Sequence, residues 1–128
     1  ATQDLSDFEN LKGNVGQLAL LLVLSWTLAG FGEELVYRGY LQARLTDFLG
    51  LGRNGVILAV AASSVLFGLA HREQGLIGVV VTTMDAVFFS ALKWRYGNNL
   101  WAAVLAHALS NTIGLVAFFF LGPIFGFW

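Results

Sequence analysis

The stretch GFGEELVYRG, residues 30–39, places two adjacent carboxylates and an arginine directly after eighteen residues, 15–32, that carry no charge. On a helix, Glu34 and Arg38 lie four residues apart on one face, where they can pair. Glu33 is five residues from Arg38 and points to a different face. An unpaired carboxylate beside hydrocarbon usually faces a cavity and has a function. Glu33 is therefore the first candidate for a catalytic residue.

The composition indicates a membrane protein. Of the 128 residues, 57% are hydrophobic and 12% are charged, and the mean hydropathy is +0.72. Such a balance differs from that of a soluble domain, where about a quarter of the residues are charged. The net charge of −1 and the lack of a basic run argue against nucleic acid as a partner. We expect an integral membrane protein.

Hydrophobic runs predict an all-α fold, a polytopic bundle of about four transmembrane helices. The runs cover residues 15–32, 55–70, 75–92 and 100–128, each near the length of about 20 residues that crosses a bilayer as a helix. Residues 1–14 are polar and acidic, and we expect them to form a surface approach to a single core of residues 15–128. The chain is expected to be a segment of a longer membrane protein.

The first helix is predicted to continue past its apolar run. If it ended at Gly32, Glu33 would lie at one membrane boundary and His71, at the end of the second run, near the other. Apolar residues recur through the polar stretch, so we expect one helix from about Asn14 to Phe48. The glycines within it are expected to allow other helices to approach closely; they are Gly30, Gly32 and Gly39.

Further polar side chains lie in the apolar helices. The second run ends with Phe67 and His71, and His107 and Asn111 lie one turn apart in the fourth. Taken singly, a membrane histidine or asparagine is often a hydrogen-bonding contact between helices, and Phe67 is most simply a packing residue. Asp85, in the third run, has no partner nearby in sequence and receives no catalytic role. One shared cavity explains the whole set more economically than four separate contacts.

The motifs at these positions resemble those of the CPBP family, the CAAX-processing and bacteriocin-processing (Abi-type) intramembrane proteases. Its patterns Glu-Glu-x-x-x-Arg, Phe-x-x-x-His and His-x-x-x-Asn are present in order, beginning at Glu33, Phe67 and His107. The resemblance implies an intramembrane endopeptidase without a cofactor. In it, Glu33 and His71 activate a water, while His107 and Asn111 stabilise the oxyanion.

The same resemblance gives Glu34, Arg38 and Phe67 a supporting role. It also implies a peptide or prenylated-protein substrate within the lipid bilayer. Two alternatives remain open. In the first, Glu33, His71 and His107 bind zinc, and the chain is a metalloprotease. In the second, the polar cluster serves folding or ion contact, and the chain is a non-catalytic scaffold or immunity protein. The sequence does not identify the substrate among CAAX proteins, bacteriocins and other peptides.

Overall fold

The computed structural model describes residues 5–123, and every regular element in that range is a helix. Four helices are long and apolar enough to cross a membrane, which confirms the predicted all-α polytopic bundle. Along the chain, the elements are η1 (Ser6–Phe8), α1 (Val15–Leu24), η2 (Ser25–Glu33), η3 (Leu35–Leu41), α2 (Gln42–Leu49), α3 (Arg53–Ala70), η4 (Arg72–Gln74), α4 (Gly75–Arg95) and α5 (Leu100–Leu121).

The segments α1, η2, η3 and α2 form one continuous helix, Val15–Leu49, as predicted from the apolar residues that run through the charged stretch. Asn14 caps its start, since the side-chain Oδ1 accepts a hydrogen bond from the Gln17 amide at 3.0 Å. The segments η2 and η3 have wide π-type turns, a form often found at functional sites. Glu33 is 18 residues from Val15 and 16 from Leu49 and therefore lies near the middle of the helix.

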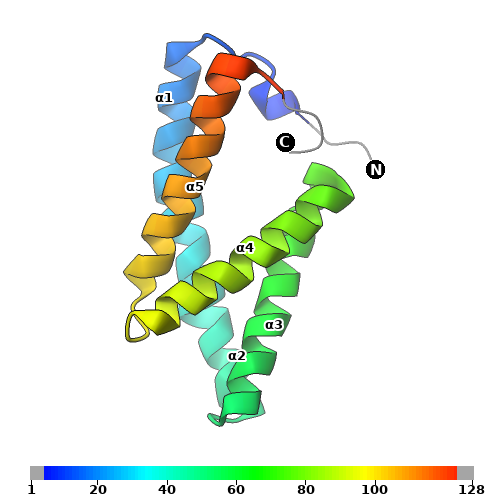
Figure 1. Cartoon of the computed structure of the whole chain (residues 1–128), viewed down its shortest axis with the longest axis vertical. Coiled ribbons are helices and arrows are strands. Elements are labelled where there is room, and N and C mark those ends of the chain that lie inside the picture. The colour runs from blue at the N-terminus through cyan, green and yellow to red at the C-terminus, as the bar shows by residue number, and fades with distance from the viewer. Residues whose placement is uncertain (1–4, 124–128) are drawn as a thin grey trace.

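The helices form two groups that diverge at one end (Figure 1). α5 packs along α1 and η2, while α3 packs against α2 and α4. Large apolar side chains are exposed on the outside of the spans, where they can contact lipid; examples are Val15, Leu20, Leu76 and Ile113. The last span ends at Leu121 rather than continuing to residue 128, because Gly122 takes a positive φ of 74°. Residues 124–128 lie outside the described range.

Glycines set the spacing of helices at two contacts. A Cβ added to Gly30 would lie 2.8 Å from the Cβ of Ala108, so the predicted close approach at Gly30 is confirmed. The same prediction is wrong for Gly32, where a Cβ would meet only the Thr27 carbonyl oxygen of its own helix, at 3.5 Å. At Gly39 a Cβ would meet Leu100 at an ordinary 3.5 Å. Gly68 supplies a second close approach, between α3 and Thr83 of α4.

The polar segment before α1 also contributes to packing. Leu11 is fully buried in a cluster with Leu115 and Phe118 of α5, and Phe8 packs against the same cluster. Gly13 donates its amide to the Phe119 carbonyl oxygen at 3.1 Å. These contacts attach the segment to the end of the α1–α5 pair, although its composition is that of a surface segment.

Candidate active site

Two histidines from different helices approach one carboxylate oxygen of a glutamate on a third helix. Glu33 ends η2, His71 follows the last residue of α3, and His107 lies in the middle of α5. The Oε2 atom of Glu33 is 3.8 Å from Nε2 of His71 and 3.9 Å from Nε2 of His107. Among the described residues this Oε2 is buried and has no hydrogen-bond partner. The long first helix thus brings Glu33 to the histidines, as its predicted continuation requires.

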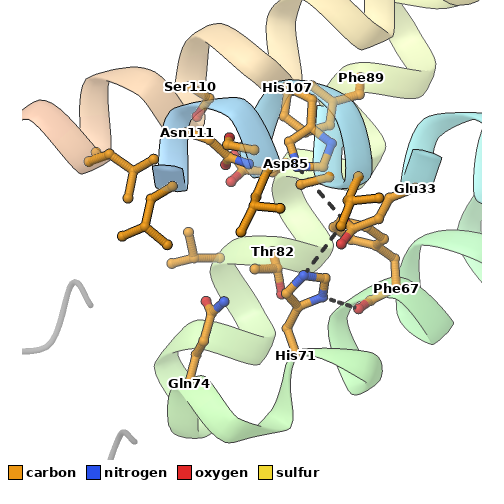
Figure 2. Close-up of a pocket in the computed structure, with 18 of the residues that line it drawn as sticks. Glu33, Phe67, His71, Gln74, Thr82, Asp85, Phe89, His107, Ser110 and Asn111 are labelled. Carbon is orange, nitrogen blue, oxygen red and sulfur yellow. Dashed lines mark hydrogen bonds and ion pairs between the residues drawn. The ribbon is translucent and has the colours of Figure 1, made fainter. Parts of the chain in front are cut away.

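These residues lie on the wall of a cavity of about 540 Å³ (Figure 2). Asn111, one turn beyond His107 on α5, lines the same cavity, and so do Phe67 and Asp85. The structure therefore brings together all four predicted catalytic residues. The volume falls within the range of about 300–1,000 Å³ typical of small-molecule sites. Apolar residues of α1 and η2 continue the wall beyond the polar groups; they include Leu21, Leu24 and Leu28.

The hydrogen bond of His71 defines which ring nitrogen carries a proton. Its Nδ1 lies 2.8 Å from the carbonyl oxygen of Phe67, which can only accept, so Nδ1 donates. In the neutral ring, Nε2 is then an acceptor that faces Glu33. Two acceptors 3.8 Å apart cannot bond each other directly, but one water can donate a hydrogen bond to each.

His107 is held by the other glutamate. Its Nδ1 lies 2.7 Å from Oε1 of Glu34, and the bond is fully buried. Because a carboxylate accepts, Nδ1 is the donor here too. The Nε2 of His107 therefore donates toward Glu33 and the cavity only when both ring nitrogens carry protons.

Glu34 and Arg38 form the predicted pair, with Arg38 Nη1 3.0 Å from Glu34 Oε1. Both side chains are buried, at 0% and 1% exposure, whereas the side chain of Glu33 is 33% exposed. In π-type turns residues five apart come closer together than in an α-helix, yet Arg38 pairs with Glu34. The prediction that the two glutamates face different surroundings is confirmed.

The comparison with known families agrees with this geometry. A sequence model of the type II CAAX prenyl endopeptidase Rce1-like family matches residues 15–113. The chain belongs to this family. No curated protein and no solved structure matches the chain. Membership supports a CAAX-type intramembrane endopeptidase, and the matched range includes Glu33, His71, His107 and Asn111.

Aromatic rings frame the site of this Rce1-like chain. The ring of Phe67 lies 4.5 Å from that of His71 and 5.8 Å from that of His107, and the guanidinium of Arg38 lies 4.4 Å from its centre. Phe67 therefore packs against both histidine rings and separates the cavity from the buried ion pair. Phe89 of α4 stacks on His107 at 5.0 Å. Sequence reasoning missed Phe89, although it lies one turn after Asp85.

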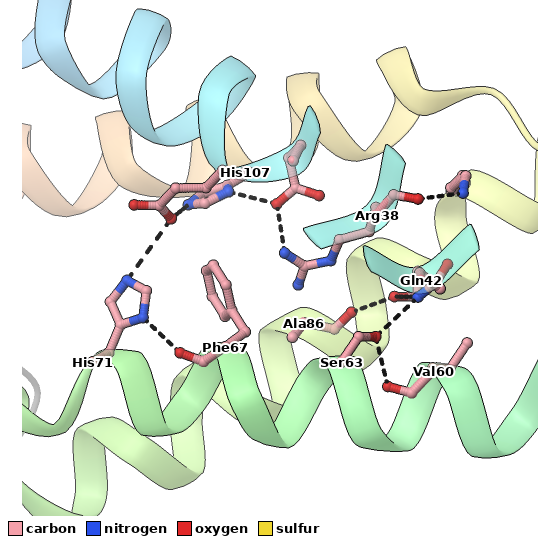
Figure 3. A network of polar contacts seen from close by, with 12 residues as sticks. Arg38, Gln42, Val60, Ser63, Phe67, His71, Ala86 and His107 are labelled. Carbon is pink, nitrogen blue, oxygen red and sulfur yellow. Dashed lines mark hydrogen bonds and ion pairs between the residues drawn. The ribbon is translucent and has the colours of Figure 1, made fainter. Parts of the chain in front are cut away.

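A second polar network continues behind the ion pair (Figure 3). Lys93 of α4 donates to the main-chain oxygen of Arg38 at 2.7 Å. The side-chain amide of Gln42 donates to Ser63 at 3.3 Å and to Ser90 at 3.0 Å. All are buried. These residues join η3 and α2 to α3 and α4 and hold the helix that carries Glu33. Sequence reasoning missed them too, and no motif marks them.

The zinc alternative can be compared with the observed geometry. Zinc ligand atoms lie about 2.0–2.2 Å from the metal and so about 3.3–3.6 Å from one another in a tetrahedral site. The Glu33 oxygen is 3.8 and 3.9 Å from the two histidine nitrogens. Within residues 5–123, no group of three His, Cys, Asp or Glu side chains is placed to hold a metal ion. As arranged here, the Glu33 oxygen and the two histidine nitrogens are therefore spaced more widely than the ligands of a bound zinc.

Proposed function

We propose that this Rce1-like chain is a glutamate-dependent intramembrane endopeptidase, which cleaves peptide or prenylated-protein substrates in the plasma membrane of a bacterium. The observation that carries the proposal is the position of Glu33 Oε2 on the wall of a cavity. This atom has no hydrogen-bond partner among the described residues and lies 3.8 and 3.9 Å from two imidazole nitrogens. Such spacing suits a water held by a carboxylate and a ring nitrogen rather than a direct bond.

The first step is attack by that water. A water placed between Glu33 and Nε2 of His71 gives a proton to the carboxylate as its oxygen bonds to the peptide carbonyl carbon. The carbonyl electrons move to the oxygen, which becomes an oxyanion. The Nε2–H of His107, present when both ring nitrogens carry protons, and the side-chain amide of Asn111 are the donors available on α5 to stabilise it.

The second step breaks the carbon–nitrogen bond. The proton held by Glu33, passed directly or through His71, goes to the leaving nitrogen as the oxyanion electrons re-form the carbonyl. The products are a carboxylic acid and an amine, and Glu33 returns to its carboxylate form. His71 is kept in one orientation throughout by its bond to the Phe67 carbonyl oxygen. Glu34 and Arg38 hold His107 without taking part in proton transfer.

Peptide cleavage by the purified protein and by its Glu33→Gln variant tests the proposal. Glutamine keeps the size of the side chain but cannot accept the proton, so we expect the rate to fall by about 10²–10⁴-fold, the usual contribution of a general base. Thermal unfolding should change little, because Glu33 makes no direct hydrogen bond within the described chain. Asp47→Asn is the matched control, since Asp47 is exposed and pairs with Arg44 away from the cavity.

Metal analysis and chelation separate the alternatives. Cleavage that resists chelation and disappears in Glu33→Gln supports the metal-free mechanism. Stoichiometric zinc, with activity lost on chelation and restored by zinc, would establish the metalloprotease instead. Cleavage that persists in a folded Glu33→Gln protein contradicts the general-base role. A chain that cleaves nothing, and whose Glu33→Gln variant retains every cellular phenotype, would be a scaffold or immunity protein.

A further inference from the structure

Asp85 is a carboxylate in the cavity that the proposed mechanism does not use. It lies on α4, within the third membrane span, and lines the cavity together with Glu33 and His107 (Figure 2). Within the described part of the chain its side chain has no hydrogen bond and no ion pair; His107 and Arg38 act on it only from longer range. An ionisable residue inside a membrane span is costly and usually contacts a ligand or a partner.

The neighbours of Asp85 do not satisfy it. Thr82, one turn earlier on the same face, donates its hydroxyl proton to carbonyl oxygens of its own helix, those of Gly78 and Val79 at 2.8 and 3.3 Å. Arg38 is bound to Glu34 through Nη1, and His107 is bound to the same carboxylate through Nδ1. Among the described residues neither forms an ion pair with Asp85, and its carboxylate is left open to the cavity.

The wall of the cavity is correspondingly acidic. Among the described residues that line it, the titratable ones are two carboxylates and two histidines: Glu33, Asp85, His71 and His107. None of the described lining residues is lysine or arginine. With His107 doubly protonated and His71 neutral, the two carboxylates still give the wall a net negative charge. Such a wall attracts ligand groups of positive charge and repels those of negative charge. A positively charged group on the substrate would complement this wall, and a carboxylate would not.

We propose that Asp85 determines substrate specificity by binding a basic side chain of the peptide, close to the scissile bond. Glu33 and Asp85 extend into the cavity from different helices, η2 and α4, so a peptide bond at Glu33 places a neighbouring side chain within reach of α4 (Figure 2). The inference rests on the proposed endopeptidase function and adds a substrate class to it: peptides with lysine or arginine beside the cleaved bond.

Three matched peptides test the inference. They differ at one position next to the central bond, which carries lysine, its uncharged isostere norleucine, or glutamate. For the wild-type protein in detergent, we expect kcat/KM to be about 10- to 100-fold higher for the lysine peptide than for the norleucine peptide, as one desolvated charge pair allows. The glutamate peptide should be the poorest, and the differences should lie mainly in KM.

Variants of Asp85 locate the effect. In Asp85→Asn the preference for lysine over norleucine should fall about tenfold, while Asp85→Glu should largely keep it. Asp85→Lys should invert the preference toward the glutamate peptide. Asp47→Asn removes an equal charge from the exposed end of α2 and should leave all three rates as in the wild type. Binding of the peptides, followed by fluorescence anisotropy, should show the same order without cleavage.

The outcomes distinguish this inference from the proposed function. If the wild type cleaves all three peptides equally, or if Asp85→Asn keeps the full preference, the role of Asp85 is overturned while cleavage still supports the protease. If no peptide is cleaved, the proposed function fails, and equal binding of the lysine and glutamate peptides would overturn the inference as well. Should Asp85→Asn not fold, the wild-type ranking and the Asp85→Glu protein still decide.

Discussion

Glu33 and Glu34 are adjacent and chemically identical, yet they lie in opposite surroundings. Glu33 faces a cavity, 33% exposed, with Oε2 bonded to nothing in the described chain. Glu34 is 0% exposed and holds Arg38 at 3.0 Å and His107 at 2.7 Å. A single residue step along the helix turns the two side chains toward these different surroundings. We call the cavity wall around Glu33 the open side; its polar groups remain available for a substrate. The buried surroundings of Glu34 and Arg38 are the closed side, where polar groups hold helices together.

Phe67 marks the boundary between the two sides. Its ring contacts His71 on the cavity side and the Arg38 guanidinium on the closed side, at 4.5 and 4.4 Å. His107 crosses that boundary, because Nδ1 bonds the buried Glu34 and Nε2 faces Glu33. A buried pair can thus fix the orientation of a ring that acts in the cavity, without itself meeting the substrate.

The largest contrast is expected between Glu33→Gln and Glu34→Gln in folding stability. Glu34→Gln leaves the buried Arg38 without a counter-charge, so the free energy of unfolding should fall by about 3–5 kcal/mol. Glu33→Gln removes no direct hydrogen bond and should cost less than about 1 kcal/mol. Denaturation of both proteins in mixed micelles measures the difference. Equal losses of unfolding free energy in the two variants would show that Glu34 contributes no more to stability than Glu33.

The sequence predicts the parts of this contrast that involve residues close together in the chain, and it does not predict those that involve residues far apart. The pairing of Glu34 with Arg38 and the continuation of the helix through Glu33 follow from local spacing and apolar residues, and both were predicted. The π-type turns of η2 and η3 were not, because no residue type marks them. The bond from His107 to Glu34 was not either, since 73 residues separate the partners.

Contacts between helices could not be predicted from the sequence either, because their partners lie far apart along the chain. Which faces of α3, α4 and α5 meet depends on packing, so the stacking of Phe89 on His107 and the bond from Lys93 to Arg38 had no local signal. Asp85 is an instructive case. The sequence showed an intramembrane acid without a partner, and the structure adds that it lines the same cavity as Glu33.

On the open side, Asn111→Ala is expected to lower activity without lowering stability. Loss of one oxyanion donor typically reduces kcat by about 10²–10³-fold, or roughly 2.7–4 kcal/mol of transition-state stabilisation. The side chain lines the cavity and takes part in none of the hydrogen bonds of the described chain. Peptide cleavage and thermal unfolding, measured on one preparation, check the expected loss of activity and the expected unchanged stability. A large drop in stability with unchanged kcat would place Asn111 on the closed side.

On the closed side, Lys93→Met is expected to lower stability by about 1.5–3 kcal/mol, the range for a hydrogen bond from a charged donor. Methionine replaces the hydrocarbon part of the lysine side chain, but the Arg38 carbonyl oxygen loses the ammonium that lies 2.7 Å from it. Lys12→Met makes the same chemical change at an exposed position and should have little effect. The two unfolding midpoints, compared in one detergent, decide whether Lys93 belongs to the closed side.

The smallest contrast tests whether the division extends to single hydroxyl groups. Ser90 accepts a bond from Gln42 at 3.0 Å and donates to the Ala86 carbonyl oxygen at 2.8 Å, and it is buried. Ser90→Ala should therefore cost about 0.5–1.5 kcal/mol of unfolding free energy, because the Gln42 amide keeps only the longer bond to Ser63. Ser110 lines the cavity and is exposed, so Ser110→Ala should change stability by a few tenths of a kcal/mol at most. Equal effects from the two serines would mean that the polar network behind Arg38 adds no stability of its own and that the closed side depends on the ion pair alone.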